Sequence, residues 1–161
     1  MSRLDSFIRR MEAQRACLNM AAEALRGMPG PVLELGLGNG RTYDHLREIM
    51  PERRIFVFER NVQAHPDCIP PDADLFLGDF WDTLPGAMAR MGERAALVHA
   101  DYGAGTPDYV TGMAAFLAET LPALVAPGAW IVSDYPIEGA GWTVLDLPEG
   151  IRPNRYFIRK A

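Results

Sequence analysis

Four side chains that could bind a ligand or move a proton stand where apolar runs end. Glu59, Asp79 and Asp101 each come one or two residues after an apolar run, at 55–58, 74–77 and 95–99. His99 is the last residue of the run at 95–99. A carboxylate accepts hydrogen bonds from hydroxyls, amines or an ammonium group, and histidine titrates near neutral pH. Parallel strands gather their carboxyl ends at one edge of a sheet. These residue types therefore predict a ligand site at that edge.

A glycine-rich loop follows the first apolar run. Val32–Leu35 leads directly into Gly36-Leu37-Gly38-Asn39-Gly40, and a helical pattern starts after it. Such a loop brings bare backbone close to a ligand and aims free N–H groups at it. The dinucleotide fingerprint G-x-G-x-x-G would need its third glycine at position 41, where this chain has Arg41. The glycine order therefore favours a cofactor other than a nicotinamide dinucleotide.

The acidic side chains suit different parts of a nucleoside-containing ligand. Glu59 is placed to accept hydrogen bonds from ribose hydroxyls. Asp79 beside Phe80 offers an acceptor and an aromatic plane, which suits adenine. Asp101 would project over the reactive end of the ligand, where it could bind an ammonium group or accept a proton. His99 is the candidate general base.

Glu34 stands inside the first apolar run. A buried carboxylate without a partner is costly. We therefore expect Glu34 to accept from N–H groups of the glycine loop, or to contact the ammonium group of a ligand.

The apolar spacing predicts alternating helices and strands. Ser2 and Asp5 form a capping-box pattern, which starts an amphipathic helix within residues 1–27 whose apolar row is interrupted by Gln14 and Arg15. Further helices are expected at 42–50, 83–91 and 107–121. Strands are expected at 32–35, 55–58, 74–77, 95–99 and 129–132, with a terminal hairpin at 142–147 and 156–158.

This alternation predicts an α/β fold with a Rossmann-like, doubly wound sheet. We expect five parallel strands plus a C-terminal hairpin with one antiparallel strand, in the order 3-2-1-4-5-7-6. The expected organisation is a single domain over residues 1–161, with an N-terminal helix in 1–27 and the Rossmann-like core in 30–161. In such sheets ligands bind where the strand order reverses, here beside the first strand.

Composition disfavours several functional classes. The net charge is −5 and there is no basic run, which argues against a nucleic-acid partner. No apolar run approaches membrane-span length, and the charged N-terminus is not a signal peptide. Cys17 and Cys68 lack metal-ligand spacing and are expected to be reduced thiols. We therefore expect a cytoplasmic protein.

The pattern E-x-G-x-G-x-G from Glu34 to Gly40, with Glu59 downstream, resembles motif I of the Rossmann-like S-adenosylmethionine-dependent methyltransferases. The resemblance runs from residue 32 to residue 158, and the chain is similar to a small bacterial family of such enzymes. It implies S-adenosylmethionine as cofactor and S-adenosylhomocysteine as product. Because the charge of the chain disfavours nucleic acid, we expect a small-molecule acceptor. The implied cofactor contacts are Glu34, Gly36, Leu37, Gly38, Asn39, Gly40, Thr42, Glu59, Arg60, Gly78, Asp79, Phe80 and Asp101.

Asp101 and Asp134 end neighbouring predicted strands, a pair that resembles the metal site of catechol-type O-methyltransferases. That family has asparagine directly after the second aspartate, where this chain has Tyr135. We therefore expect no metal.

Two alternatives share parts of the same pattern. A non-catalytic protein could bind S-adenosylmethionine or its product through the same loop. A nicotinamide-dependent oxidoreductase could also use Glu59, but its fingerprint needs a glycine where this chain has Arg41. The short segment after the fifth strand leaves little structure over the site, which suits either an open site or a homodimer that completes it.

Overall fold

The computed structural model describes residues 2–161. The helices are α1 (Arg3–Ala24), α2 (Arg41–Ile49), α3 (Phe80–Thr83), α4 (Met88–Met91) and α5 (Pro107–Thr120). The strands are β1 (Val32–Leu35), β2 (Ile55–Glu59), β3 (Leu75–Leu77), β4 (Ala95–Ala100), β5 (Val125–Ser133), β6 (Thr143–Val144) and β7 (Phe157–Lys160).

The seven strands form one sheet in the order β3-β2-β1-β4-β5-β7-β6. The first five are mutually parallel, and β7 inserts antiparallel between β5 and β6. The predicted strand order and hairpin are therefore confirmed. The order reverses beside β1, whose Glu34 pairs in register with His99 of β4.

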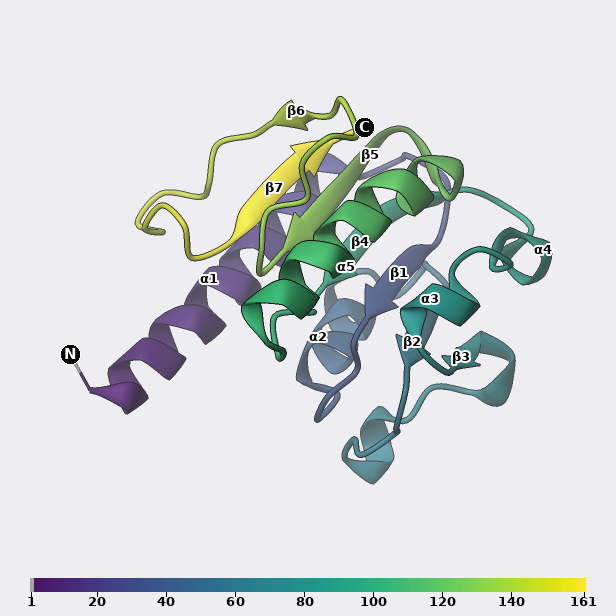
Figure 1. The fold of residues 1–161 in the computed structure, drawn as a ribbon, viewed down its shortest axis with the longest axis horizontal. Coiled ribbons are helices and arrows are strands. Elements are labelled where there is room, and N and C mark those ends of the chain that lie inside the picture. The colour runs from purple at the N-terminus through teal and green to yellow at the C-terminus, as the bar shows by residue number, and fades with distance from the viewer. Residues whose placement is uncertain (1) are drawn as a thin grey trace.

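Helices cover both faces of the sheet (Figure 1). On one face, Leu18 of α1 and Leu46 of α2 are fully buried against strand residues such as Leu97. On the other face, Met113 and Leu117 of α5 close a second apolar cluster. Burial on both faces explains why β1, β2 and β4 are apolar apart from Glu34, Glu59 and His99.

The start of α1 is fixed by its sequence. The Ser2 hydroxyl accepts a hydrogen bond from the Asp5 N–H at 3.0 Å, and the Asp5 carboxylate accepts one from the Ser2 N–H at 3.0 Å. This is the predicted capping box, which satisfies N–H groups that a helix start leaves free.

The predicted helix over 83–91 is wrong. α3 ends at Thr83 and α4 begins at Met88, with Pro85 and Gly86 between them. Proline lacks the N–H that would continue the helix, and glycine pays the largest entropic cost in a helix. β5 is also longer than predicted, because it begins at Val125, before the Pro-Gly pair.

None of the helices within residues 2–161 is long and apolar enough to cross a membrane.

Candidate cofactor site

The loop between β1 and α2 needs its glycines. Gly36 has φ +92° and Gly40 has φ +88°, a backbone region that disfavours other residues. A Cβ on Gly36 would lie 2.6 Å from the Asp101 carbonyl oxygen, and one on Gly40 would strike the Cβ of Cys68. The glycines therefore let the loop pass directly against β4 and the segment after β2.

Glu59, at the end of β2, holds the outer part of this loop. Its Oε2 accepts from the N–H groups of Leu37 at 2.8 Å and Gly38 at 3.2 Å. Its Oε1 accepts from the N–H of Asn61 at 3.0 Å. A carboxylate has about four lone-pair sites, and three of those of Glu59 are used in this way. Glu59 can therefore hold the loop and still accept a hydrogen bond from one hydroxyl of a ligand.

A cleft of about 700 Å³ lies over the carboxyl ends of β1, β2, β3 and β4. The predicted cofactor residues that line it are Gly36, Leu37, Gly38, Asn39, Thr42, Glu59, Arg60, Gly78, Asp79, Phe80 and Asp101. The predicted residues outside its lining are Glu34, Gly40 and His99.

Asp79 and Phe80 form the β3 end of the cleft. The Asp79 carboxylate lies 3.5 Å from the Arg60 guanidinium, and both side chains are about half exposed or more. The neighbouring Trp81 packs on Phe116, with ring centroids 4.2 Å apart, and does not line the cleft. Phe80 is therefore the aromatic residue beside Asp79 in the cleft.

Asp101 faces the cleft from the end of β4, and Arg10 of α1 reaches it. Arg10 Nη2 donates to Asp101 Oδ1 at 2.6 Å and lies 3.9 Å from Asp134. Gln14 Nε2 lies 3.4 Å from Asp101 Oδ2. The N-terminal helix therefore supplies a cation and an amide to the carboxylate that we expect at the reactive end.

Asp134, at the end of β5, lies behind Asp101. Its two carboxylate oxygens accept from the N–H groups of Tyr102 at 3.1 Å and Gly103 at 2.9 Å. Burial, together with the nearby negative charge of Asp101, raises the pKa of Asp134 to about 6. Across residues 2–161, no cluster of three or more His, Cys, Asp or Glu side chains could hold a metal ion.

Glu34 and His99 lie beneath the cleft in a buried polar chain, not in the cleft. Glu34 accepts from the Thr42 hydroxyl and pairs with His99 Nδ1 at 2.7 Å. His99 Nε2 lies 2.7 Å from the Tyr156 hydroxyl, which also accepts from Gln14 Nε2 at 2.9 Å. Glu34 therefore does not bind the loop amides as predicted, because Glu59 takes them.

His99 is fully buried, and both of its ring nitrogens have partners. Burial alone would lower the pKa of His99, but the carboxylate of Glu34, with those of Asp101 and Asp134, leaves it raised. A general base must reach the proton that it removes. The position of His99 therefore argues against that role, and Asp101 is the candidate that faces the cleft.

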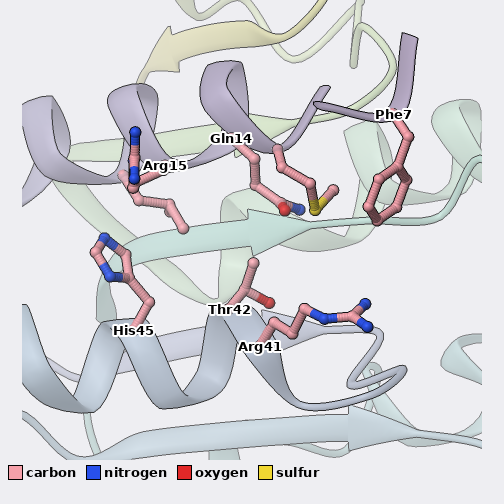
Figure 2. A pocket seen from close by; sticks show the side chains of 8 residues that line it. Phe7, Gln14, Arg15, Arg41, Thr42 and His45 are labelled. Carbon is pink, nitrogen blue, oxygen red and sulfur yellow. The ribbon is translucent and has the colours of Figure 1, made fainter. Parts of the chain in front are cut away.

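A smaller cavity of about 300 Å³ opens from the cleft between α1 and α2. Figure 2 shows Phe7 and Gln14 of α1 facing Arg41 and Thr42 of α2 across it. The rest of its lining is Met11, Arg15, Leu18 and His45.

Several lining residues were not predicted from the sequence. Phe7, Arg10 and Met11 of α1 line the cleft, together with Arg41 at the start of α2. Phe7, Arg10 and Gln14 recur at spacings of three and four, which places them on one helix face. That spacing, together with the interruption of the apolar row at Gln14, is the sequence feature that could have placed this face of α1 in the cleft.

A sequence model of the family described as S-adenosyl-L-methionine methyltransferase matches residues 1–161. The chain belongs to this family. A comparison with curated proteins finds no match.

Solved structures of methyltransferases share the fold. The S-adenosyl-L-methionine methyl transferase from Silicibacter pomeroyi DSS-3 is 45% identical, with a TM-score of 0.92 over 100% of this chain and 99% of its own. The plantazolicin methyltransferase BpumL, solved with SAH (S-adenosylhomocysteine) and a triazolic desmethylPZN analog, is 12% identical, with a TM-score of 0.55 over 78% of this chain and 46% of its own. Human methyltransferase-like protein 13, solved with SAH, is 13% identical, with a TM-score of 0.55 over 94% and 80%.

The cleft fits the cofactor that this family uses. No atom lies within 4 Å of where a Cβ on Gly38 would be, so the loop leaves space at a position that lines the cleft. Glu59, Asp79 and Asp101 stand at the ends of β2, β3 and β4. These three carboxylates are hydrogen-bond acceptors, and such a cofactor offers hydroxyl, amine and ammonium donors.

Proposed function

We propose that this protein transfers a methyl group from S-adenosylmethionine to a small-molecule acceptor. The main support for this proposal is that Glu59, Asp79 and Asp101 line one cleft together with the glycine loop. Each carboxylate is an acceptor of the kind that one part of the cofactor requires. The SAH complexes of the more distant fold relatives agree with this assignment.

S-adenosylmethionine supplies a methyl group on a sulfonium, which is already a good leaving group. The residues of the chain then have mainly to orient the acceptor and keep water away. Glu59 would accept from a ribose hydroxyl while holding Leu37 and Gly38 in place. Asp79 and Phe80 would bind the adenine.

Asp101 would serve the reactive end of the site. It is 29% exposed, it faces the cleft, and Arg10 and Gln14 fix its two oxygens. In this position it can bind the ammonium group of the methionine part or take a proton from an acceptor hydroxyl or amine.

The test uses S-adenosylmethionine labelled in its methyl group. Purified protein is incubated with the labelled cofactor and a low-molecular-mass cell extract, and the small molecules are then separated. We expect label in a product that heat-denatured protein does not form, and less of it with Asp101→Asn. A protein that binds the cofactor but leaves all label on it would contradict the proposal and favour the non-catalytic alternative.

A further inference from the structure

The smaller cavity between α1 and α2 has a mixed apolar and cationic lining. Phe7, Met11 and Leu18 supply apolar surface. Arg15, Arg41 and His45 supply positive or titratable groups, and no carboxylate belongs to the lining. This composition stands out in a chain whose net charge is −5.

The two arginines are available to a ligand. Within residues 2–161, the side chains of Arg15 and Arg41 have no hydrogen-bond or ion-pair partner, and both residues are exposed. By contrast, Arg47 on α2 is bound to Asp44 at 2.6 Å, and Arg10 to Asp101 at the same distance. His45 pairs with Asn19 Oδ1 through Nε2 at 2.8 Å, which leaves Nδ1 of its ring.

The cavity has two distinct ends. Arg15 and His45 lie at one end, and Phe7 and Arg41 lie at the other (Figure 2). Phe7, Met11, Gln14, Arg41 and Thr42 also line the cofactor cleft, whereas Arg15, Leu18 and His45 do not. A molecule lying in the cavity would therefore have one end in the cofactor cleft and the other beside Arg15.

We propose that this cavity binds the methyl acceptor, and that the acceptor is an elongated apolar molecule with an anionic group. The apolar body lies between Met11 and Leu18, and the carboxylate or phosphate lies at the Arg15 and His45 end. The end that receives the methyl group reaches past Gln14 toward Asp101. This inference rests on the proposed function, because it deepens the description of the same site.

The cavity volume and lining agree with this assignment. At about 300 Å³ the cavity is at the lower end of the range for small-molecule sites, which are mostly apolar with few polar groups. Guanidinium groups bind carboxylates and phosphates through paired N–H donors.

Two fluorescent probes that differ in one charge test the ligand chemistry. The first is 8-anilinonaphthalene-1-sulfonate, an apolar anion, and the second is N-phenyl-1-naphthylamine, the same ring system without the sulfonate. Both are titrated into protein saturated with S-adenosylhomocysteine and into protein without it. We expect saturable binding of the anionic probe in both states, because the Arg15 end lies outside the cofactor cleft.

Arg15→Gln is the informative variant, and Arg152→Gln is its matched control, since Arg152 is exposed and lies outside the cavity. We expect Arg15→Gln to weaken the binding of the sulfonate probe about fivefold, as for the loss of an exposed ion pair. The affinities for the uncharged probe and for S-adenosylhomocysteine should not change. Arg152→Gln should change none of the three affinities.

Three outcomes would overturn the proposal. They are an unchanged sulfonate affinity in Arg15→Gln, an equal loss in Arg152→Gln, and complete displacement of the probe by S-adenosylhomocysteine. Absence of S-adenosylhomocysteine binding would instead contradict the proposed function. The effect of Arg15→Gln on the two probes would still decide the ligand chemistry of the cavity.

Discussion

Glu59 connects the shape of the glycine loop to the proposed binding of the ribose. Glu59→Ala removes the acceptor of the Leu37 and Gly38 amides as well as the expected hydroxyl contacts. We expect S-adenosylhomocysteine affinity to fall by about 1.5–3 kcal/mol, as for hydrogen bonds to a charged group. Isothermal titration calorimetry measures the loss, with Glu48→Ala on the exposed side of α2 as control. An unchanged affinity would remove Glu59 from the site.

Asp101 is the residue where α1 and the end of β4 meet. Asp101→Asn keeps the shape of the side chain but removes the charge that Arg10 contacts at 2.6 Å. We expect S-adenosylhomocysteine to bind about tenfold more weakly, because an ammonium group would lose its counter-charge beside Arg10. Asp146→Asn, at an exposed position, is the matched control for calorimetry. Wild-type cofactor affinity together with wild-type methyl transfer would exclude the role proposed for Asp101.

The residues at the strand ends could be predicted from the sequence, but their partners could not. Asp79 and Asp101 follow apolar runs, so their place at the cleft comes from the topology alone. Arg10 was missed because its contact with Asp101 spans 91 positions and depends on where α1 packs. The loop amides predicted as partners of Glu34 were wrong for the same reason, since the register of β1 against β4 places His99 beside Glu34.

Among the elements, the loop between β1 and α2 depends on positive φ angles that favour glycine. Gly36→Ala would place a methyl group 2.6 Å from the Asp101 carbonyl oxygen at φ +92°. The left-handed conformation alone costs roughly 1–2 kcal/mol for other residues. We expect a lower melting temperature and weaker S-adenosylhomocysteine binding, measured by thermal unfolding with and without the ligand.

Gly112→Ala is the control for that substitution. Gly112 lies exposed within α5, where an added Cβ has no atom within 4 Å. Alanine should stabilise this helix by up to about 1 kcal/mol without changing ligand affinity. A Gly36→Ala protein as stable as this control would show that the loop tolerates a side chain.

The sequence predicted most helices and strands well where a single local feature, such as a capping residue, determines the element. The Ser2 and Asp5 pair marks the start of α1, and Thr106 caps α5 through the Tyr109 N–H at 3.3 Å. The region around Pro85 was harder, because apolar spacing favours a helix while proline and glycine oppose it. There the breakers determine the structure, and two short helices form.

For the whole molecule, the contribution of Asp134 to stability should fall as pH rises from about 4 to about 6. The pKa of Asp134 is raised from 3.8 to about 6 in the fold, chiefly by burial. The folded state therefore holds a proton that the unfolded chain has lost, and this contribution disappears as pH passes the folded pKa. The difference corresponds to about 3 kcal/mol at most.

Urea unfolding of the wild type and of Asp134→Asn at pH 4 and pH 7 checks this. In Asp134→Asn, the free energy of unfolding should lack the decrease between pH 4 and pH 7 that Asp134 causes. The asparagine amide also suits the Tyr102 and Gly103 N–H groups less well than a carboxylate does, and this loss applies at every pH. Parallel pH dependence in the two proteins would show that Asp134 does not titrate in this range.

The cleft at the point of strand reversal is proposed to bind S-adenosylmethionine. Calorimetric titration of the wild-type protein with S-adenosylhomocysteine and, separately, with NAD tests this proposal most directly. We predict saturable one-to-one binding of S-adenosylhomocysteine and no measurable binding of NAD at the same concentrations. Equal binding of NAD, or no binding of S-adenosylhomocysteine, would show that the cleft is not an S-adenosylmethionine site.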